Sequence, residues 1–336
     1  MTRKSSAINR VRCLVSSLII LILILIGLFI SFAFGAVEIP LSQIFDVLTS
    51  TSDDVQKTII LDSRLPRALV AILVGCNLAL SGVLLQTVTR NALADPGIIG
   101  VTAGAALAAT IVLVIIPKIS IYLPIAAFVG ALISAFFVYT VSWRPGVGSS
   151  PIRMILAGVA INSILGAFIG LLMVAFADRI PAMMFWTSGT FNGRGWDHFN
   201  IILPYTLIGL LLSIYLKPSL SVMELGDDVA ISMGVSVEKT RLIAFVAAAL
   251  LAGSAASVAG LVGFIGLVVP HLVRLILGGN KWLIPVSALG GSALLLWSDI
   301  IAKLTFAPAE MPVGVVTGLI GGPYFVFLLY KTKWLR

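Results

Sequence analysis

Long uncharged stretches separated by short polar or glycine-rich breaks make up most of the chain. A helix needs about 20 predominantly apolar residues to cross a bilayer, and the chain divides into ten stretches of roughly that kind. We expect spans at about 13–37, 64–89, 98–117, 122–143, 154–176, 201–216, 242–262, a short one ending near 274, then 282–302 and 312–330. The pattern predicts an all-α integral membrane protein of about ten transmembrane helices, forming a single transmembrane domain over residues 1–336.

Composition and charge agree with a membrane protein. Of the 336 residues, 59% are hydrophobic and 11% charged, whereas about a quarter of a soluble domain is charged. The net charge of +8 comes from basic residues clustered between apolar runs, which fits membrane topology and anionic lipid head groups better than nucleic acid. Most of the 22 Lys and Arg residues fall on one side of the ten spans, which predicts that both termini are cytoplasmic.

Two outer segments have helical character of their own. Between the first two spans, Leu41, Ile44, Phe45 and Leu48 recur at helical spacing and predict a short surface helix. Residues 182–191 are too apolar for an ordinary loop and too short to cross, so we expect a half-helix shielded by protein in the outer leaflet. Three glycine pairs are spaced for close helix packing. They are Gly100 with Gly104, Gly166 with Gly170, and Gly318 with Gly322.

One long polar interruption, residues 217–241, breaks the apolar second half on the inner side. Asp227 and Asp228 are suited to capping the first turn of a short helix, and Gly234 to ending it in the left-handed conformation. Val229, Ala230 and Met233 would then share one face of that helix, and Ser236 would cap the next one. These residues fit two readings equally, a solvated loop with one helical turn or an element that docks another protein.

Several kinds of chemistry have no residues to support them in the sequence. No charged residue falls near the middle of a predicted span, with His271 as the one titratable exception, which disfavours a proton- or sodium-driven carrier. No phosphate-binding G-x-x-x-x-G-K-[ST] motif occurs, so we expect no ATP hydrolysis by this chain. Cys13 and Cys76 have no partner spacing and read as small buried hydrophobes, while His271 reads as a packing or interface residue rather than a proton relay.

Several short motifs, in a fixed order, resemble one transporter family. They are Arg64–Arg67 with Ser81–Gln86 and Asn91–Gly97, then Leu225–Gly234, then Gly263–Arg274 with Pro312–Val316. From Arg64 to the carboxyl end, the chain resembles the FecCD/BtuC permeases, which are the membrane subunits of bacterial ABC importers for ferric siderophores, haem and vitamin B12. The resemblance implies a BtuC-like type II importer permease in the bacterial cytoplasmic membrane.

The same resemblance implies partners. A second permease subunit, identical or a sister chain, would complete a central path. A dimer of cytoplasmic ABC ATPases would lie beneath it, and an extracytoplasmic substrate-binding protein would dock above. ATP and Mg would be bound by the ATPase, and no cofactor or metal by this chain.

The resemblance also assigns three groups of residues. The ATPase-coupling residues would be Leu225, Gly226, Asp227, Asp228, Val229, Ala230, Met233 and Gly234. The residues docking the binding protein would be Arg64, Arg67 and Lys303, where Lys303 replaces an Arg of a relative and so loses the bidentate fork. The inner gate region would be Ser149, Ser150 and Arg153, with Pro151 and Ile152 in place of a relative's small polar residues.

Arg64 and Arg67 can also be judged without the family. They lie on the outer side, where positive charge is disfavoured, so they need a reason to be there. Docking a partner is one reason; contact with lipid phosphate or a local pair with Asp62 are the alternatives.

The sequence therefore favours an ATP-driven importer permease, with ferric siderophores as the first cargo and vitamin B12 or haem as alternatives. An ion-coupled secondary carrier and a membrane scaffold without transport stay open as hypotheses of other classes.

Overall fold

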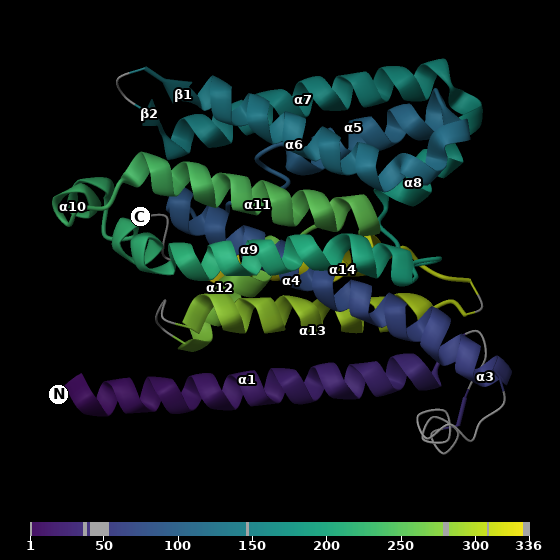
Figure 1. Cartoon of the computed structure of the whole chain (residues 1–336), viewed down its shortest axis with the longest axis horizontal. Helices are drawn as coiled ribbons and strands as arrows, with labels where there is room; N and C mark the ends of the chain where they lie inside the picture. The colour runs from purple at the N-terminus through teal and green to yellow at the C-terminus, as the bar shows by residue number, and fades with distance from the viewer. Residues whose placement is uncertain are drawn as a thin grey trace.

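The computed structural model describes residues 2–35, 39–40, 54–145, 148–277, 282–307 and 309–331, and helices account for most of them (Figure 1). The α-helices are α1 (Thr2–Ala33), α3 (Asp54–Thr58), α4 (Leu65–Thr89), α5 (Val101–Val114), α6 (Leu123–Ser142), α7 (Pro151–Ala175), α8 (Ile180–Thr187), α9 (Trp196–Met223), α10 (Asp227–Ser232), α11 (Val237–Ala259), α12 (Ile265–Leu277), α13 (Leu283–Leu304) and α14 (Val313–Lys331). Shorter turns of other helix types are η1 (Ile59–Arg64), η2 (Pro117–Tyr122) and η3 (Ala177–Arg179). The strands β1 (Trp143–Arg144) and β2 (Gly148–Ser149) pair antiparallel.

The ten expected spans are all present as helices. Seven helical segments of the described chain are long and apolar enough to cross a membrane, and three shorter apolar helices, Val101–Val114, Ile265–Leu277 and Val313–Leu328, fill the remaining places. Both chain ends, α10 and the β1–β2 ribbon lie at the same end of the molecule, and α3 and α8 lie at the opposite end (Figure 1). The prediction of an all-α, multi-pass membrane protein is confirmed, with the small ribbon as its one departure in the described residues.

Helix α4 is the centre of the molecule. It packs against α13, α11, α9 and α12, and its apolar side chains are buried along almost its whole length. Two glycines permit this packing: a Cβ at Gly82 would lie 1.9 Å from the carbonyl oxygen of Gly266, and one at Gly75 would lie 2.2 Å from that of Gly291. Small residues at these positions let the helix backbones touch.

Hydrogen bonds between polar side chains and neighbouring helices add to this packing. Asn77 Nδ2 donates to Ser254 Oγ at 3.1 Å, and Ser81 Oγ donates to the Ala248 carbonyl at 2.8 Å. Because the hydrocarbon region offers no water, such groups must find partners inside the protein. The centre of the bundle is thus held by close backbone contact together with hydrogen bonds between helices.

The outer helices of the bundle expose apolar surface instead. In the most apolar stretch of α1, only 17% of the residues are buried, and in that of α7 only 11% are. In the first of the three predicted glycine pairs, a Cβ on Gly104 would lie 2.3 Å from the Gly130 carbonyl oxygen, and one on Gly100 would lie 3.0 Å from Ser134 Oγ. Nothing lies within 4 Å of such an atom on Gly166, Gly170, Gly318 or Gly322. Within this chain, the predicted close approach is therefore found for the first pair and not for the other two.

Several boundaries differ from those expected. Helix α9 runs to Met223 and α11 begins at Val237, so the inner interruption is shorter than the predicted 217–241. The second span begins earlier, through α3 and the π-helical turn η1, because this helical run continues without a break into Leu65. The half-helix expected at 182–191 is present as α8, with Met183 and Trp186 buried. The surface helix predicted around Leu41–Leu48 lies outside the described residues.

Candidate functional site

The inner elbow, Leu225–Gly234, presents apolar side chains where the bundle ends. Leu225 is 67% exposed, Ile231 61%, Met233 62% and Val229 41%. In Figure 1 its helix α10 lies at the end of the molecule where α1 begins, beyond the ends of α9 and α11. Apolar groups gathered in this way beyond the ends of the spans are typical of a protein–protein contact.

The elbow is built differently from the prediction in two details. Its N-cap is Gly226, with φ of 120°, and no side chain caps the first turn, because the Asp227 carboxylate is used elsewhere. Ala230 is fully buried against Met223 and Val237, so it does not share the exposed face of Val229 and Met233. Gly234 does adopt the predicted left-handed conformation, with φ of 81°.

Arg241 anchors the elbow to α11. Its Nη2 donates to Asp227 Oδ2 at 2.9 Å, and Arg90 approaches the same oxygen at 3.6 Å. The Arg241 side chain is only 4% exposed, whereas that of Asp227 is 31% exposed. The elbow is therefore fixed by a largely buried ion pair rather than held only by its own helical turn.

The predicted gate residues lie beside this anchor. Ser149, in β2, is 4% exposed and is hydrogen-bonded to Glu238 and Arg241 of α11. Ser150 is the N-cap residue of α7. Arg153 Nη2 donates to the Gly148 carbonyl at 2.8 Å. The structure thus brings the gate region and the coupling residues together at the inner end of the chain. Their roles in gating and coupling stay predictions.

At the opposite end, a set of charged residues that we call the outer charge cluster contains all three predicted docking residues. Its members are Arg64, Arg67, Asp299, Lys303 and Glu310. Arg67 is at its centre: its guanidinium is 2.8 Å from Asp299 and 2.9 Å from Glu310. Asp299 is 1% exposed, so its charge depends on this pairing.

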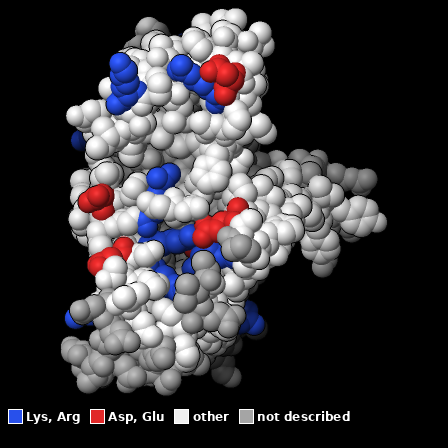
Figure 2. All heavy atoms as spheres, turned by 90° about the vertical axis from the view of Figure 1, so that its right-hand side faces the viewer, with Lys and Arg blue, Asp and Glu red and all other residues white. Residues whose placement is uncertain are grey.

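The other two basic residues of the outer charge cluster are also turned inward. Arg64 is 7% exposed and donates to the Phe32 carbonyl of α1, while Lys303 is 6% exposed and donates to Ser31 Oγ at 3.1 Å. The Arg67 side chain is 12% exposed, so all three predicted docking residues are largely enclosed by this chain, and their docking role stays a prediction. Figure 2 looks onto this end of the molecule and shows basic and acidic groups lying next to one another near the middle of the face.

The family-like motifs meet each other in space. Gln86 Nε2 donates to the carbonyls of Gly266 and Leu267 at 3.1 and 3.3 Å, and Arg274 donates to Gln86 Oε1. In the turn after α4, Asp95 accepts a 2.8 Å bond from the Gly97 N–H, and burial raises the pKa of Asp95 although this bond opposes the shift. The motifs around 81–97 and 263–274 therefore form one packed unit.

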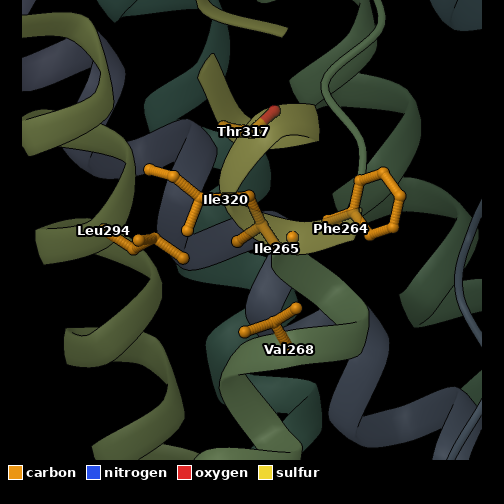
Figure 3. A pocket seen from close by; sticks show the side chains of 7 residues that line it. Phe264, Ile265, Val268, Leu294, Thr317 and Ile320 are labelled. Carbon is orange, nitrogen blue, oxygen red and sulfur yellow. The ribbon is translucent and has the colours of Figure 1, made fainter. Parts of the chain in front are cut away.

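An apolar crevice separates α12, α13 and α14. Its lining includes Phe264, Ile265, Val268, Leu294 and Ile320 (Figure 3). Its volume is only about 10 Å³, roughly enough for one water molecule. Phe264 has φ of 68° and lies against Gly321, where a Cβ would be 2.4 Å from its side chain. The crevice marks tight packing at the start of α12 and has no room for a chelate.

Sequence reasoning missed four residues of these sites. They are Asp299 and Glu310, which pair with Arg67, Glu238, which bonds Ser149, and Arg241, which pairs with Asp227. The spacing of Glu238 and Arg241, three positions apart at the start of a span, was the available signal. Nothing in the local pattern pointed from Arg67 to its distant partners.

Known proteins resemble the whole chain. The hemin transport system permease protein HmuU of Yersinia pestis is 39% identical over 330 residues, which cover 95% of each chain. The iron(3+)-hydroxamate import system permease protein FhuG of Bacillus subtilis is 36% identical, over 93% of this chain and 95% of its own. An inward-facing structure of a metal-chelate type ABC transporter superposes with a TM-score of 0.83 at 30% identity, covering 94% of this chain and 99% of that one.

The profile of the FecCD transport family matches residues 22–331, which takes in nine complete spans and the C-terminal part of α1. Both the outer charge cluster and the inner elbow lie within this match. The chain belongs to the FecCD transport family.

Proposed function

We propose that this chain is the membrane-spanning permease subunit of an ATP-driven importer of iron chelates, with ferric siderophores as the first candidate cargo. Its partners would be a cytoplasmic ABC ATPase dimer, a second permease subunit and an extracytoplasmic substrate-binding protein. ATP and Mg would be bound by the ATPase.

The exposed apolar face of the inner elbow carries this proposal. Val229 and Ile231 lie on α10, and Leu225 and Met233 lie directly beside its ends. A largely buried ion pair fixes this helix to α11. A rigid, apolar protrusion is suited to seating in a cleft of a soluble partner, since the side chains lose little freedom on binding. An ATPase that closes around such a protrusion could push on the helices above it.

The cargo follows from the relatives and not from a pocket. The first relative described above is a hemin permease and the second an iron(3+)-hydroxamate permease, at 39% and 36% identity. So small a difference in identity does not choose between cargoes, and haem is accordingly the second candidate. Ferric siderophores come first because they are the commonest cargo of the family that the chain resembles.

Reconstitution in liposomes tests the transport function. We expect uptake of a radiolabelled ferric hydroxamate against its gradient only when the ATPase, the binding protein and ATP are all present. Haem and cobalamin, assayed in parallel, would identify a different cargo of the same machine.

Two outcomes would contradict the proposal. Uphill uptake by the chain alone, abolished by an uncoupler, would indicate a secondary carrier. Absence of flux for every chelate, in liposomes whose ATPase binds the chain and hydrolyses ATP, would indicate a scaffold.

A further inference from the structure

The inner elbow and the β1–β2 ribbon are joined by two residues of one helical turn. Glu238 and Arg241 both lie at the start of α11, directly after the elbow. Between them they contact the coupling residue Asp227 on one side and the gate-region residue Ser149 on the other.

Arg241 bridges the two regions with a single guanidinium group. Nη1 donates to the Ser149 carbonyl at 2.7 Å, and Nη2 donates to Asp227 Oδ2 at 2.9 Å. Because this group is planar and rigid, it fixes the distance between its two acceptors. A lysine, with one ammonium nitrogen, cannot hold both acceptors in the same geometry.

Glu238 also hydrogen-bonds Ser149. Its carboxylate accepts bonds of 3.1 Å from the Ser149 N–H and from Ser149 Oγ, and one of 3.0 Å from the Tyr139 hydroxyl. All three polar groups of Ser149 are thereby held by α11. At neighbouring Gly148, with φ of 74°, a Cβ would lie 2.6 Å from Glu238 Oε2, so glycine allows the carboxylate to come this close.

We infer that Arg241 and Glu238 are positioning residues that make the inner elbow and the β1–β2 ribbon move as one body during transport. The ribbon leads within two residues into α7, whose apolar side chains are mostly unburied in this chain. A displacement imposed on the elbow by the ATPase would therefore reach the beginning of α7 directly. This inference rests on the proposed function.

The first test measures coupling in the complete transporter, reconstituted with its ATPase and binding protein. We expect Arg241→Lys and Glu238→Gln to keep assembly and ATP hydrolysis while the chelate transported per ATP falls by about 2- to 30-fold, the range usual for residues that couple two sites. Lys239→Gln is the matched control, because Lys239 is an exposed cation in the same turn. An unchanged ratio in both variants would overturn the inference.

A second test keeps Glu238 and Arg241 unchanged, so it does not depend on the stability of variants at these two positions. Spin labels at Ser232 in the elbow, Arg144 in the ribbon and Arg12 near the inner end of α1 report distances with and without ATP; all three residues are exposed. We expect the distance from Ser232 to Arg144 to stay constant while both distances to Arg12 change. Independent movement of elbow and ribbon, or no movement of either, would overturn the inference.

The two proposals fail in different ways. If the wild-type assembly does not concentrate any chelate with ATP, the proposed function is wrong. If the wild type transports and Arg241→Lys transports equally well per ATP, only the inference about the link is wrong.

Discussion

At the scale of single residues, Arg67 shows how this fold keeps charges at the end of an apolar bundle. Its guanidinium bonds Asp299 and Glu310 at once, and charge-assisted pairs of this geometry are about twice as strong as neutral hydrogen bonds. The two acids differ in setting, since the Asp299 side chain is 1% exposed and that of Glu310 is 29% exposed.

This difference predicts unequal losses of stability. Asp299→Ala should cost about 3–5 kcal/mol of unfolding free energy, because it breaks a buried pair, whereas Glu310→Gln should cost roughly 1 kcal/mol or less. Thermal unfolding of the purified protein in detergent would measure both. Equal shifts in midpoint would show that burial does not set the strength of these pairs.

Glu310→Gln should also change docking if the binding protein uses Arg67. Removing this carboxylate releases one side of the guanidinium, so affinity for the binding protein should rise by a few-fold and fall again as salt is added. Asp178→Asn is the control, because Asp178 is an exposed acid at the same end of the chain, with its side chain 77% exposed. A drop in affinity for Glu310→Gln alone would instead place Glu310 itself in the contact.

At the scale of elements, α10 has one buried and one exposed side, and substitutions should separate them. Met233→Glu should weaken ATPase binding at least tenfold while leaving the thermal midpoint unchanged, because Met233 is 62% exposed. Ala230→Glu should lower the midpoint, because Ala230 is fully buried. Affinity measured by surface plasmon resonance, beside thermal unfolding, tests both. A lower thermal midpoint for Met233→Glu would contradict the assignment of Met233 to the exposed side.

Helix packing gives a second contrast between elements. Gly82→Ala should destabilise the protein by about 1–3 kcal/mol or prevent its folding, because its Cβ would meet the Gly266 backbone. Gly166→Ala should be tolerated, because nothing lies within 4 Å of that position and alanine favours a helix. Expression level and thermal midpoint in detergent report on both. If Gly82→Ala behaves like Gly166→Ala, the close approach of α4 and α12 is not needed for folding.

At the scale of the whole molecule, a dense centre built on α4 is surrounded by helices with unburied apolar faces. Lipid can cover such a face, and so can a second permease subunit. The glycines of α7 and α14 that face open space would allow another chain to approach closely.

We therefore expect each nanodisc to hold two permease chains. These would be either two copies of this 35.5 kDa chain or one copy with a sister permease. Mass photometry with the sister chain present and absent distinguishes the two cases. Single chains under both conditions would contradict a paired permease.

The sequence alone determined the number and approximate positions of the spans, the shared side of both termini and the family. Crossing a membrane depends on the length and apolarity of contiguous segments, and sidedness depends on where basic residues fall, so both can be read locally. The family was also readable, because its motifs are short and ordered. The elbow's position and its Gly234 terminus followed from the same local pattern.

Only the tertiary structure decided which charges pair and which glycines pack. Arg67 and Asp299 are 232 positions apart, Arg67 and Glu310 are 243 apart, and Arg241 meets Ser149 across 92. No periodicity links such distant residues, and the same glycine spacing occurs on helices that pack inside the chain and on helices that do not. Exposure followed from this arrangement. Basic residues placed correctly at the outer end are largely buried there, with Arg67 paired to two acids and with Arg64 and Lys303 hydrogen-bonded to α1.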